Sequence, residues 1–209
     1  VMTVASMDGF AGELPEGIAL DRLGNIYLGM SGLGEIWMLD ATGEFMEVVA
    51  SFDLNEGDSG VLGLRFDSEG NLFAAVSSTN AEVNGVWMVT EEGKERLAGT
   101  EAIAFPNDVD VTPNGTIYIS DSAAGAVWRY VAGGPADMWV QDEALEGTGA
   151  FGLGVPIGAN GLAAVPGKKM PIARDIAGSS KGGVVVANSE KAQVVYVPIL
   201  RDGSAGEPM

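Results

Sequence analysis

A repeat of about 45 residues is the feature that most limits how this chain can fold. Each copy reads as an alternating strand, a glycine turn, a second apolar strand and a third strand that carries one aromatic residue. The turn glycines Gly24, Gly70 and Gly115 lie 46 and 45 residues apart. The aromatic position is filled in step by Trp37, Trp87, Trp128 and Tyr196. One blade of a β-propeller has this period and this strand content.

The repeat predicts an all-β fold, a β-propeller of the six-bladed type with about four blades present in the chain. Thirty-one glycines among 209 residues agree with many short strands joined by turns. A β-sandwich would also supply short strands, but not self-similarity at a fixed period. Six blades need roughly 270 residues. We therefore expect residues 1–209 to form a single propeller domain, incomplete at its C-terminus, with the residues after Leu200 leading into a fifth blade.

The composition excludes several function classes. Acidic residues outnumber basic ones by 29 to 11, for a net charge of −18, which argues against a nucleic-acid partner and suits a soluble protein or a cation binder. The chain has no cysteine and no histidine, so thiol chemistry, Ser-His-Asp triads and histidine-bound zinc are excluded. No apolar run reaches the length of a membrane span. A secreted or periplasmic location is favoured, with no signal-like segment at the start of the sequence.

One column of the repeat carries oxygen donors. The residue immediately before the first strand of each unit is Glu16, Leu62, Asn107 or Asn160. The innermost strands of a propeller line its central channel, so we expect these residues to face one another from separate blades. Burying a carboxylate and two amides without a partner is unfavourable. An all-oxygen set suits calcium better than zinc, and the alternative is that each residue caps its loop and binds water.

The motifs PEGIALDRLGNIYL, FPNDVDV and GANGLA resemble those of the SMP-30/gluconolactonase/LRE-like family. Paraoxonases and strictosidine-synthase-like proteins are more distant relatives of that family. The resemblance covers nearly the whole chain and implies a calcium-dependent six-bladed propeller, with Glu16, Asn107 and Asn160 as metal ligands. It also implies an aspartate from a later blade as further ligand and general base. By the repeat spacing this aspartate falls near or beyond Met209, so no catalytic residue is assigned.

Three further residues are candidates for substrate binding. Asp108 stands beside the expected site. Phe151 and Val155 belong to a segment, residues 142–159, that enters the fourth unit directly before Asn160. Its apolar residues would wall a pocket for an apolar substrate, or else pack onto the rim of the propeller. A second insertion, residues 167–183, holds four of the eleven basic residues and is expected to be a solvated loop on the opposite face.

The sequence thus favours a metal-dependent hydrolase of lactones or related esters, with a small-molecule substrate and a divalent cation, most readily calcium, as cofactor. Such a cation polarises a carbonyl while a carboxylate activates water, and neither role needs histidine. The alternative is a binding or scaffold propeller of the NHL type, in which a metal only braces the channel. Fold alone does not decide between them.

Overall fold

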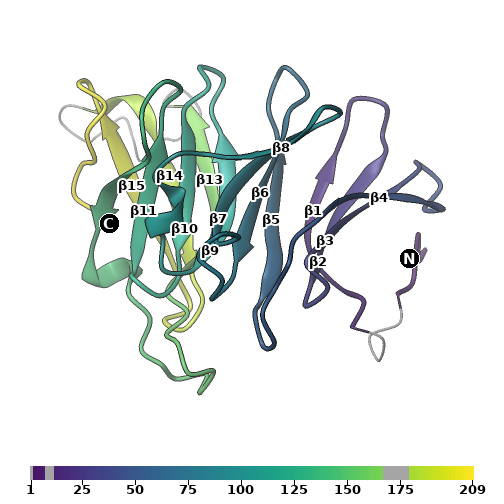
Figure 1. Ribbon diagram of the computed structural model, residues 1–209. Coiled ribbons are helices and arrows are strands. Elements are labelled where there is room, and N and C mark those ends of the chain that lie inside the picture. Colours follow the sequence, from purple (N-terminus) through teal and green to yellow (C-terminus); the bar gives the residue numbers. More distant parts are fainter. Residues whose placement is uncertain (1, 8–11, 167–178) are drawn as a thin grey trace. The chain divides into compact units, whose positions relative to one another are not determined.

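The structure, a computed structural model, describes residues 2–7, 12–166 and 179–209 and is built from antiparallel strands (Figure 1). The chain divides into two compact units, residues 1–106 and 107–209, which are taken separately below. In the described residues helix is limited to single 3₁₀ turns such as η2 (Thr100–Ala102) and η3 (Glu143–Leu145). The prediction of an all-β chain is therefore confirmed. None of the described helices is long and apolar enough to cross a membrane.

Unit 1 contains two four-stranded blades. Blade 1 is made of β1 (Leu14–Leu20), β2 (Ile26–Ser31), β3 (Glu35–Leu39) and β4 (Phe45–Ser51). Blade 2 is made of β5 (Gly60–Phe66), β6 (Leu72–Ser77), β7 (Gly85–Thr90) and β8 (Gly93–Arg96). Within each blade every strand pairs with the next in sequence, so each blade is an antiparallel meander.

Unit 2 contains two more blades. Blade 3 is made of β9 (Pro106–Val111), β10 (Ile117–Asp121), β11 (Ala126–Tyr130) and β12 (Asp137–Gln141). Blade 4 is made of β13 (Ala159–Pro166), β14 (Ser179–Asn188) and β15 (Gln193–Leu200). Residues 167–178 of the basic insertion, with Lys168, Lys169 and Arg174, lie outside the described residues.

The residues after Leu200 do not lead away toward a fifth blade, as we had expected. They turn at Gly203 and run back along β15, where Tyr196 and Met209 exchange two backbone hydrogen bonds of 2.9 and 3.0 Å. The amide of Gly206 also donates to Pro198 O at 2.7 Å. This segment occupies the place of a fourth strand on blade 4. The sequence did not reveal it because its glycine, proline and small residues carry no strand periodicity.

The repeat positions fall where the sequence predicted them. The four aromatic residues lie in the third strand of their blades, β3, β7, β11 and β15. The turn glycines Gly24, Gly70 and Gly115 have φ of 88°, 99° and 79°, which only glycine adopts without strain. In blade 2 the Asp67 carboxylate fixes this turn by accepting the backbone amides of Glu69, Gly70 and Asn71. The conformation of these turns is therefore determined by residues within the turns themselves.

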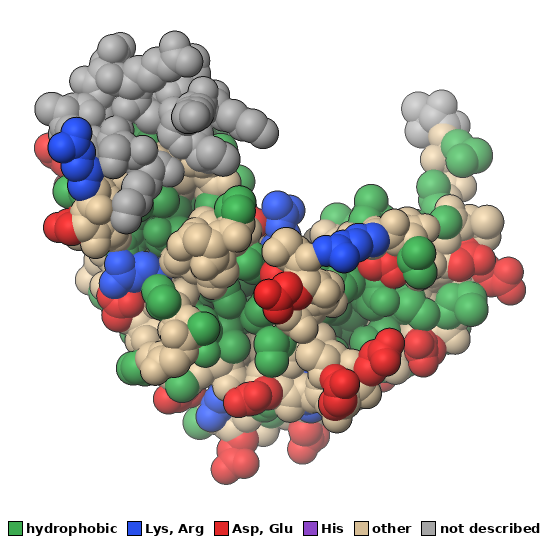
Figure 2. All heavy atoms as spheres, turned by 90° about the horizontal axis from the view of Figure 1, so that it is seen from above, with side chains coloured by type: hydrophobic (Ala, Val, Ile, Leu, Met, Phe, Trp, Pro, Cys, Tyr) green, Lys and Arg blue, Asp and Glu red, His purple; other side chains and the backbone are tan. Residues whose placement is uncertain are grey.

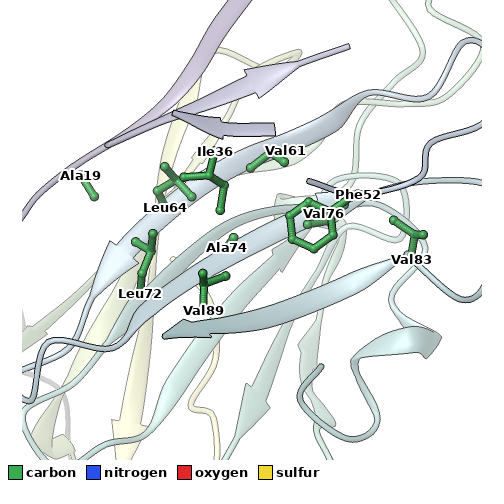
Figure 3. Close-up of a cluster of buried hydrophobic side chains, with 10 residues drawn as sticks. All are labelled: Ala19, Ile36, Phe52, Val61, Leu64, Leu72, Ala74, Val76, Val83 and Val89. Atoms are coloured by element: carbon green, nitrogen blue, oxygen red, sulfur yellow. The ribbon is translucent and has the colours of Figure 1, made fainter. Parts of the chain in front are cut away.

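Apolar side chains fill the space between the blades of unit 1. Figure 3 shows this cluster, in which Ile36, Val61 and Val76 are fully buried and come from β3, β5 and β6. Each such side chain contributes about 1.5–3 kcal/mol on burial. The inner strands meet so closely that a Cβ at Gly17 would lie 1.9 Å from Leu62 O. Glycine in β1 is thus a condition for this blade contact.

Unit 2 has its own core between blades 3 and 4. Its fully buried members include Val127 of β11, Leu145 of η3 and Val184 of β14. At one edge the rings of Tyr118 and Trp139 meet edge to face, with centroids 4.9 Å apart. The acidic excess is carried on the surface, where acidic side chains predominate over basic ones on the face seen in Figure 2.

Candidate functional site

The predicted donor column lies inside the inner strands, not immediately before them. Glu16 is the extra residue in β1 where the pairing register with β2 shifts between Pro15 and Gly17. Register shifts of the same kind flank Leu62 in β5 and Asn160 in β13. Such β-bulges bend a strand and re-aim a side chain, and they are common beside active sites. Three of the four column residues, Glu16, Leu62 and Asn160, therefore lie at a β-bulge.

The two asparagines of the column both belong to unit 2. Asn107 is the second residue of β9 and only 7% exposed, and Asn160 is half-buried in β13. Among the described residues, the one buried side-chain polar atom without a hydrogen-bond partner is the Tyr196 hydroxyl, so neither asparagine amide is both buried and unpartnered. Carboxamide oxygens are suitable ligands for a hard cation, and a cation at these two residues stays a prediction.

Glu16 belongs to unit 1 and is exposed in β1. Leu62, the column residue without an oxygen, is buried in β5 at 5% exposure and contributes packing. Within the described residues no group of three or more acidic residues could hold a metal ion by itself. Two of the three assigned ligands are amides, which are not members of such an acidic group. The meeting of Glu16 with the two asparagines stays a prediction.

Asp108 and Asp110 connect the inner strands of unit 2. The Asp108 carboxylate accepts the amide of Leu162 at 2.8 Å, and that of Asp110 accepts the amide of Ala164 at 2.7 Å. Each carboxylate uses its second oxygen to accept the amide of the residue that follows it in β9. The spacing of two places both side chains on one face of β9. These aspartates satisfy two amides along β13 and hold that strand, with Asn160 near its start.

The geometry bears on the predicted role of Asp108. Both of its oxygens accept backbone amides, one from Val109 in β9 and the other from Leu162 in β13, so one oxygen positions β13. Its own amide donates to the hydroxyl of Ser120, which is fully buried in β10. A contact between Asp108 and substrate stays a prediction. Asp110 was not singled out from the sequence, although the alternation in NDVDV placed it on the same strand face.

The segment that precedes Asn160 is a loop with a narrow neck at Gly147 and Gly158. A Cβ at Gly158 would lie 2.1 Å from Leu145 O, and a Cβ at Gly147 would lie 2.7 Å from Ile157 N. The ends of a loop held this close are characteristic of an Ω-loop. In Figure 1 the segment between β12 and β13 extends beyond the ends of the strands of unit 2. We refer to residues 147–158 as the neck loop.

Phe151 and Val155, the two predicted wall residues, are exposed on this loop. Their side chains are 52% and 37% exposed, and Leu153 between them is 68% exposed. Ile157, by contrast, is buried near the neck. The prediction that apolar residues here pack onto the rim therefore describes Ile157, whereas the outer three face solvent. Contact with a substrate stays a prediction.

Glu190, in the turn between β14 and β15, was missed by the sequence analysis. Its carboxylate accepts the backbone amides of Thr148, of Gly149 at 2.6 Å and of Phe151 at 3.2 Å. Partial desolvation raises the pKa of Glu190, but these amide hydrogen bonds outweigh it and lower the pKa to about 2. The signal was absent because about 40 residues separate Glu190 from the loop, and its own turn looks ordinary.

Unit 2 also contains a cavity of about 340 Å³, at the other end of the blades from the asparagines. It lies beside the turn at Pro113 and is lined by Tyr118, Arg129 and residues of the β15 edge. The Arg129 guanidinium is engaged there by Asp137 at 2.9 Å and by Gly203 O at 2.9 Å. The cavity contains none of the predicted site residues. We place the candidate site at the end of the inner strands where Asn107 and Asn160, two of the predicted ligands, lie.

Comparisons with known proteins identify the fold. No family model matches the sequence, and no curated protein is significantly similar to it. A streptogramin B lyase structure is 13% identical, with a TM-score of 0.60, over 92% of this chain and 53% of that one. A proposed gluconolactonase is 16% identical, with a TM-score of 0.62, over 93% of this chain and 62% of that one.

A third similar structure is an auxiliary nutrient binding protein from Bacteroides thetaiotaomicron. It is 14% identical, with a TM-score of 0.64, over 94% of this chain and 41% of that one. The chain thus spans about half the length of the solved structures that it matches. At these identities the likeness is one of fold. It agrees with the propeller that the sequence repeat predicted and with the resemblance to gluconolactonase-type propellers.

Proposed function

We propose that this chain is part of a metal-dependent hydrolase of lactones or related esters, with Glu16, Asn107 and Asn160 as ligands of a calcium ion. The observation that carries the proposal is the pair of asparagine side chains in unit 2. They occupy the same phase of the repeat in adjacent blades, where Asn107 is 7% exposed and Asn160 is half-buried. Amide and carboxylate oxygens are suitable ligands for calcium.

In this proposal the residues of the chain have separate roles in binding the ion and in positioning its ligands. A calcium ion, when bound, supplies Lewis-acid polarisation of a substrate carbonyl. Asp108 and Asp110 hold β13 by its amides and so fix the backbone that carries Asn160. One oxygen of Asp108 accepts the amide of Leu162 in β13 and the other accepts that of Val109 in β9, which favours a positioning role over proton abstraction. The general base would be an aspartate from a blade that these 209 residues do not include.

The second candidate is a binding propeller without catalysis. The observation that favours it is the likeness of fold to a nutrient binding protein, with a TM-score of 0.64. In that case the same ligands would brace the inner strands around an ion. A channel-facing aspartate in a further blade would favour the hydrolase over the binding protein, because a carboxylate base is needed only for catalysis.

Hydrolysis of a lactone panel, with calcium and with a chelator, tests the proposal. We expect turnover with calcium and its loss after chelation, and we expect Asn107→Ala to reduce kcat/KM by about tenfold or more, about 1.4 kcal/mol. Gly134→Ala is the control, because its Cβ would meet no atom closer than 3.9 Å. Calcium binding without turnover of any lactone would support the binding propeller. Turnover that resists chelation would contradict the metal-dependent mechanism.

A further inference from the structure

The neck loop is unusual in being ordered by a carboxylate that is distant in sequence. Glu190 accepts three backbone amides from it, those of Thr148, Gly149 and Phe151. Glu190 N also donates to Ile157 O at 3.3 Å, and Ser189 N donates to Gly158 O at 3.2 Å. The turn of blade 4 thus contacts both legs of the loop. These contacts give the loop a defined shape without a core of its own.

The loop presents apolar side chains on its outer part. Phe151, Leu153 and Val155 alternate with glycines and are 52%, 68% and 37% exposed. Gly152 and Gly154 have φ of 67° and 84°, so the backbone between the apolar residues is in the left-handed conformation. Three large apolar side chains held outward on an ordered loop are an unfavourable arrangement in water alone. Covering these side chains with an apolar group removes apolar surface from water and lowers the free energy.

The place of the loop in the chain indicates what that group is. The loop returns to blade 4 at Gly158, and β13 begins at Ala159, so Asn160 lies two residues beyond the neck. Because Gly158 N donates to Ser122 O at 3.0 Å, the neck is fixed to the end of blade 3. A ligand at the bulged end of the inner strands would therefore have the neck loop beside it.

We propose that Glu190 is a positioning residue that holds Phe151, Leu153 and Val155 as an apolar wall, and that the site accordingly takes lactones or esters with an alkyl or aryl substituent in preference to polyhydroxylated sugar lactones. The inference rests on the proposed function for the identity of the reacting group. The wall itself rests on the contacts of Glu190 and on the exposed side chains. The depressed pKa of Glu190 agrees with a carboxylate that is charged and engaged at neutral pH.

The test uses the protein with the blade that carries the proposed general base, and three γ-lactones of increasing alkyl length, γ-butyrolactone, γ-hexalactone and γ-decalactone, with gluconolactone as the polar comparison. Dissociation constants are measured by calorimetry, and hydrolysis is followed separately. We expect affinity to rise about twofold per methylene, below the roughly fourfold of complete burial, because a wall covers one side only. Phe151→Ala is expected to remove most of this increment while leaving gluconolactone binding within about twofold.

Glu190→Ala is expected to act in the same direction, through the loop. It should remove the chain-length increment and also the hydrogen-exchange protection of the amides of Thr148, Gly149 and Phe151. Glu190→Gln keeps one acceptor oxygen and should restore part of both. Glu91→Ala is the matched control, since Glu91 is an exposed glutamate in a turn of unit 1. It should change neither readout.

The outcomes separate the inference from the proposed function. Hydrolysis that is indifferent to chain length, in the parent and in the variants, would overturn the wall and leave the hydrolase intact. Chain-length-dependent binding that Phe151→Ala and Glu190→Ala abolish, without hydrolysis, would support the wall and overturn the hydrolase. Absence of both binding and hydrolysis would overturn both. A Glu190→Ala variant that keeps the increment would also overturn the role given to Glu190.

Discussion

Blades 1 and 2 meet through glycine backbone, whereas blades 3 and 4 are connected by aspartate side chains. In unit 1 the Cα of Gly17 packs against Leu62 O, and apolar residues fill the space between the sheets. In unit 2 Asp108 and Asp110 accept amides of β13 at 2.8 and 2.7 Å. Both contacts bring two inner strands together. One depends on the absence of a side chain and the other on directional hydrogen bonds.

The two kinds of contact coincide with a difference in the column residues of the two units. Unit 1 places Leu62 at the column position, and this residue adds to the apolar contact. Unit 2 has Asn107 and Asn160 at the column position, and the carboxylates of two neighbouring aspartates hold β13 by its amides. A hydrogen bond fixes distance and direction, whereas apolar packing tolerates small shifts. The hydrogen-bonded contact between β9 and β13 is thus the one suited to holding two amide side chains at a defined separation.

Gly17→Ala should have the largest effect and would test the close backbone contact between β1 and β5. The new Cβ would lie 1.9 Å from Leu62 O, so β1 and β5 must separate. We expect a loss of about 3 kcal/mol in the free energy of unfolding, at the upper end for overpacking. Urea denaturation measures it, with Gly134→Ala as a control that should stay within about 0.5 kcal/mol. A Gly17→Ala protein as stable as the control would show that the close approach is not required.

Asp110→Ala should have the next largest effect and would test the aspartate hydrogen bonds between β9 and β13. It leaves the amides of Ala164 and Val111 without their acceptor, at a cost of about 2 kcal/mol. Asp110→Asn retains one acceptor oxygen and should lose about half as much. The same urea assay applies. Equal stability of parent and Asp110→Ala would mean that β13 is held by other contacts.

The pH dependence of the neck loop should be the smallest effect, because it concerns a loop and not a blade. The pKa of Glu190 is lowered from 4.5 to about 2 in the folded chain. Its contribution is therefore fully present above about pH 4.5 and is lost as the pH falls through about 2. Amide exchange at Thr148 and Gly149 is measured between pH 6 and pH 2 and divided by the intrinsic rate at each pH, and the resulting protection should fall as the pH approaches 2. In Glu190→Gln the same amides should show no such transition, and an identical pH profile in both proteins would contradict the assignment.

Local signals in the sequence predicted the elements that depend on local structure. The turn glycines and the aromatic residue of each third strand gave the blades, because both follow directly from the repeat. The placement of the chain end along β15 was wrong in the prediction, since Gly203, Gly206 and Pro208 lack strand periodicity. Its partner strand, not its own residues, determines its conformation.

The candidate site was predictable in its residue types and less so in its supports. The column of Glu16, Asn107 and Asn160 could be read from one repeat phase. Asp110 and Glu190 could not, because each acts on backbone amides about 40–55 residues away, and backbone amides carry no mark in the sequence. Long-range hydrogen bonds from side chain to backbone depend on how two blades pack. That packing is fixed only in the folded chain.

Calcium titration by calorimetry tests the central claim most directly, since it compares the column residues of the two units in one readout. We predict that Asn107→Ala, Asn160→Ala and Glu16→Gln each weaken calcium binding by about tenfold or more, about 1.4 kcal/mol. Leu62→Met, which retains the volume of the apolar column residue, should bind calcium like the parent. Calcium binding in Asn107→Ala as tight as in the parent would contradict the assignment of this column as the metal site.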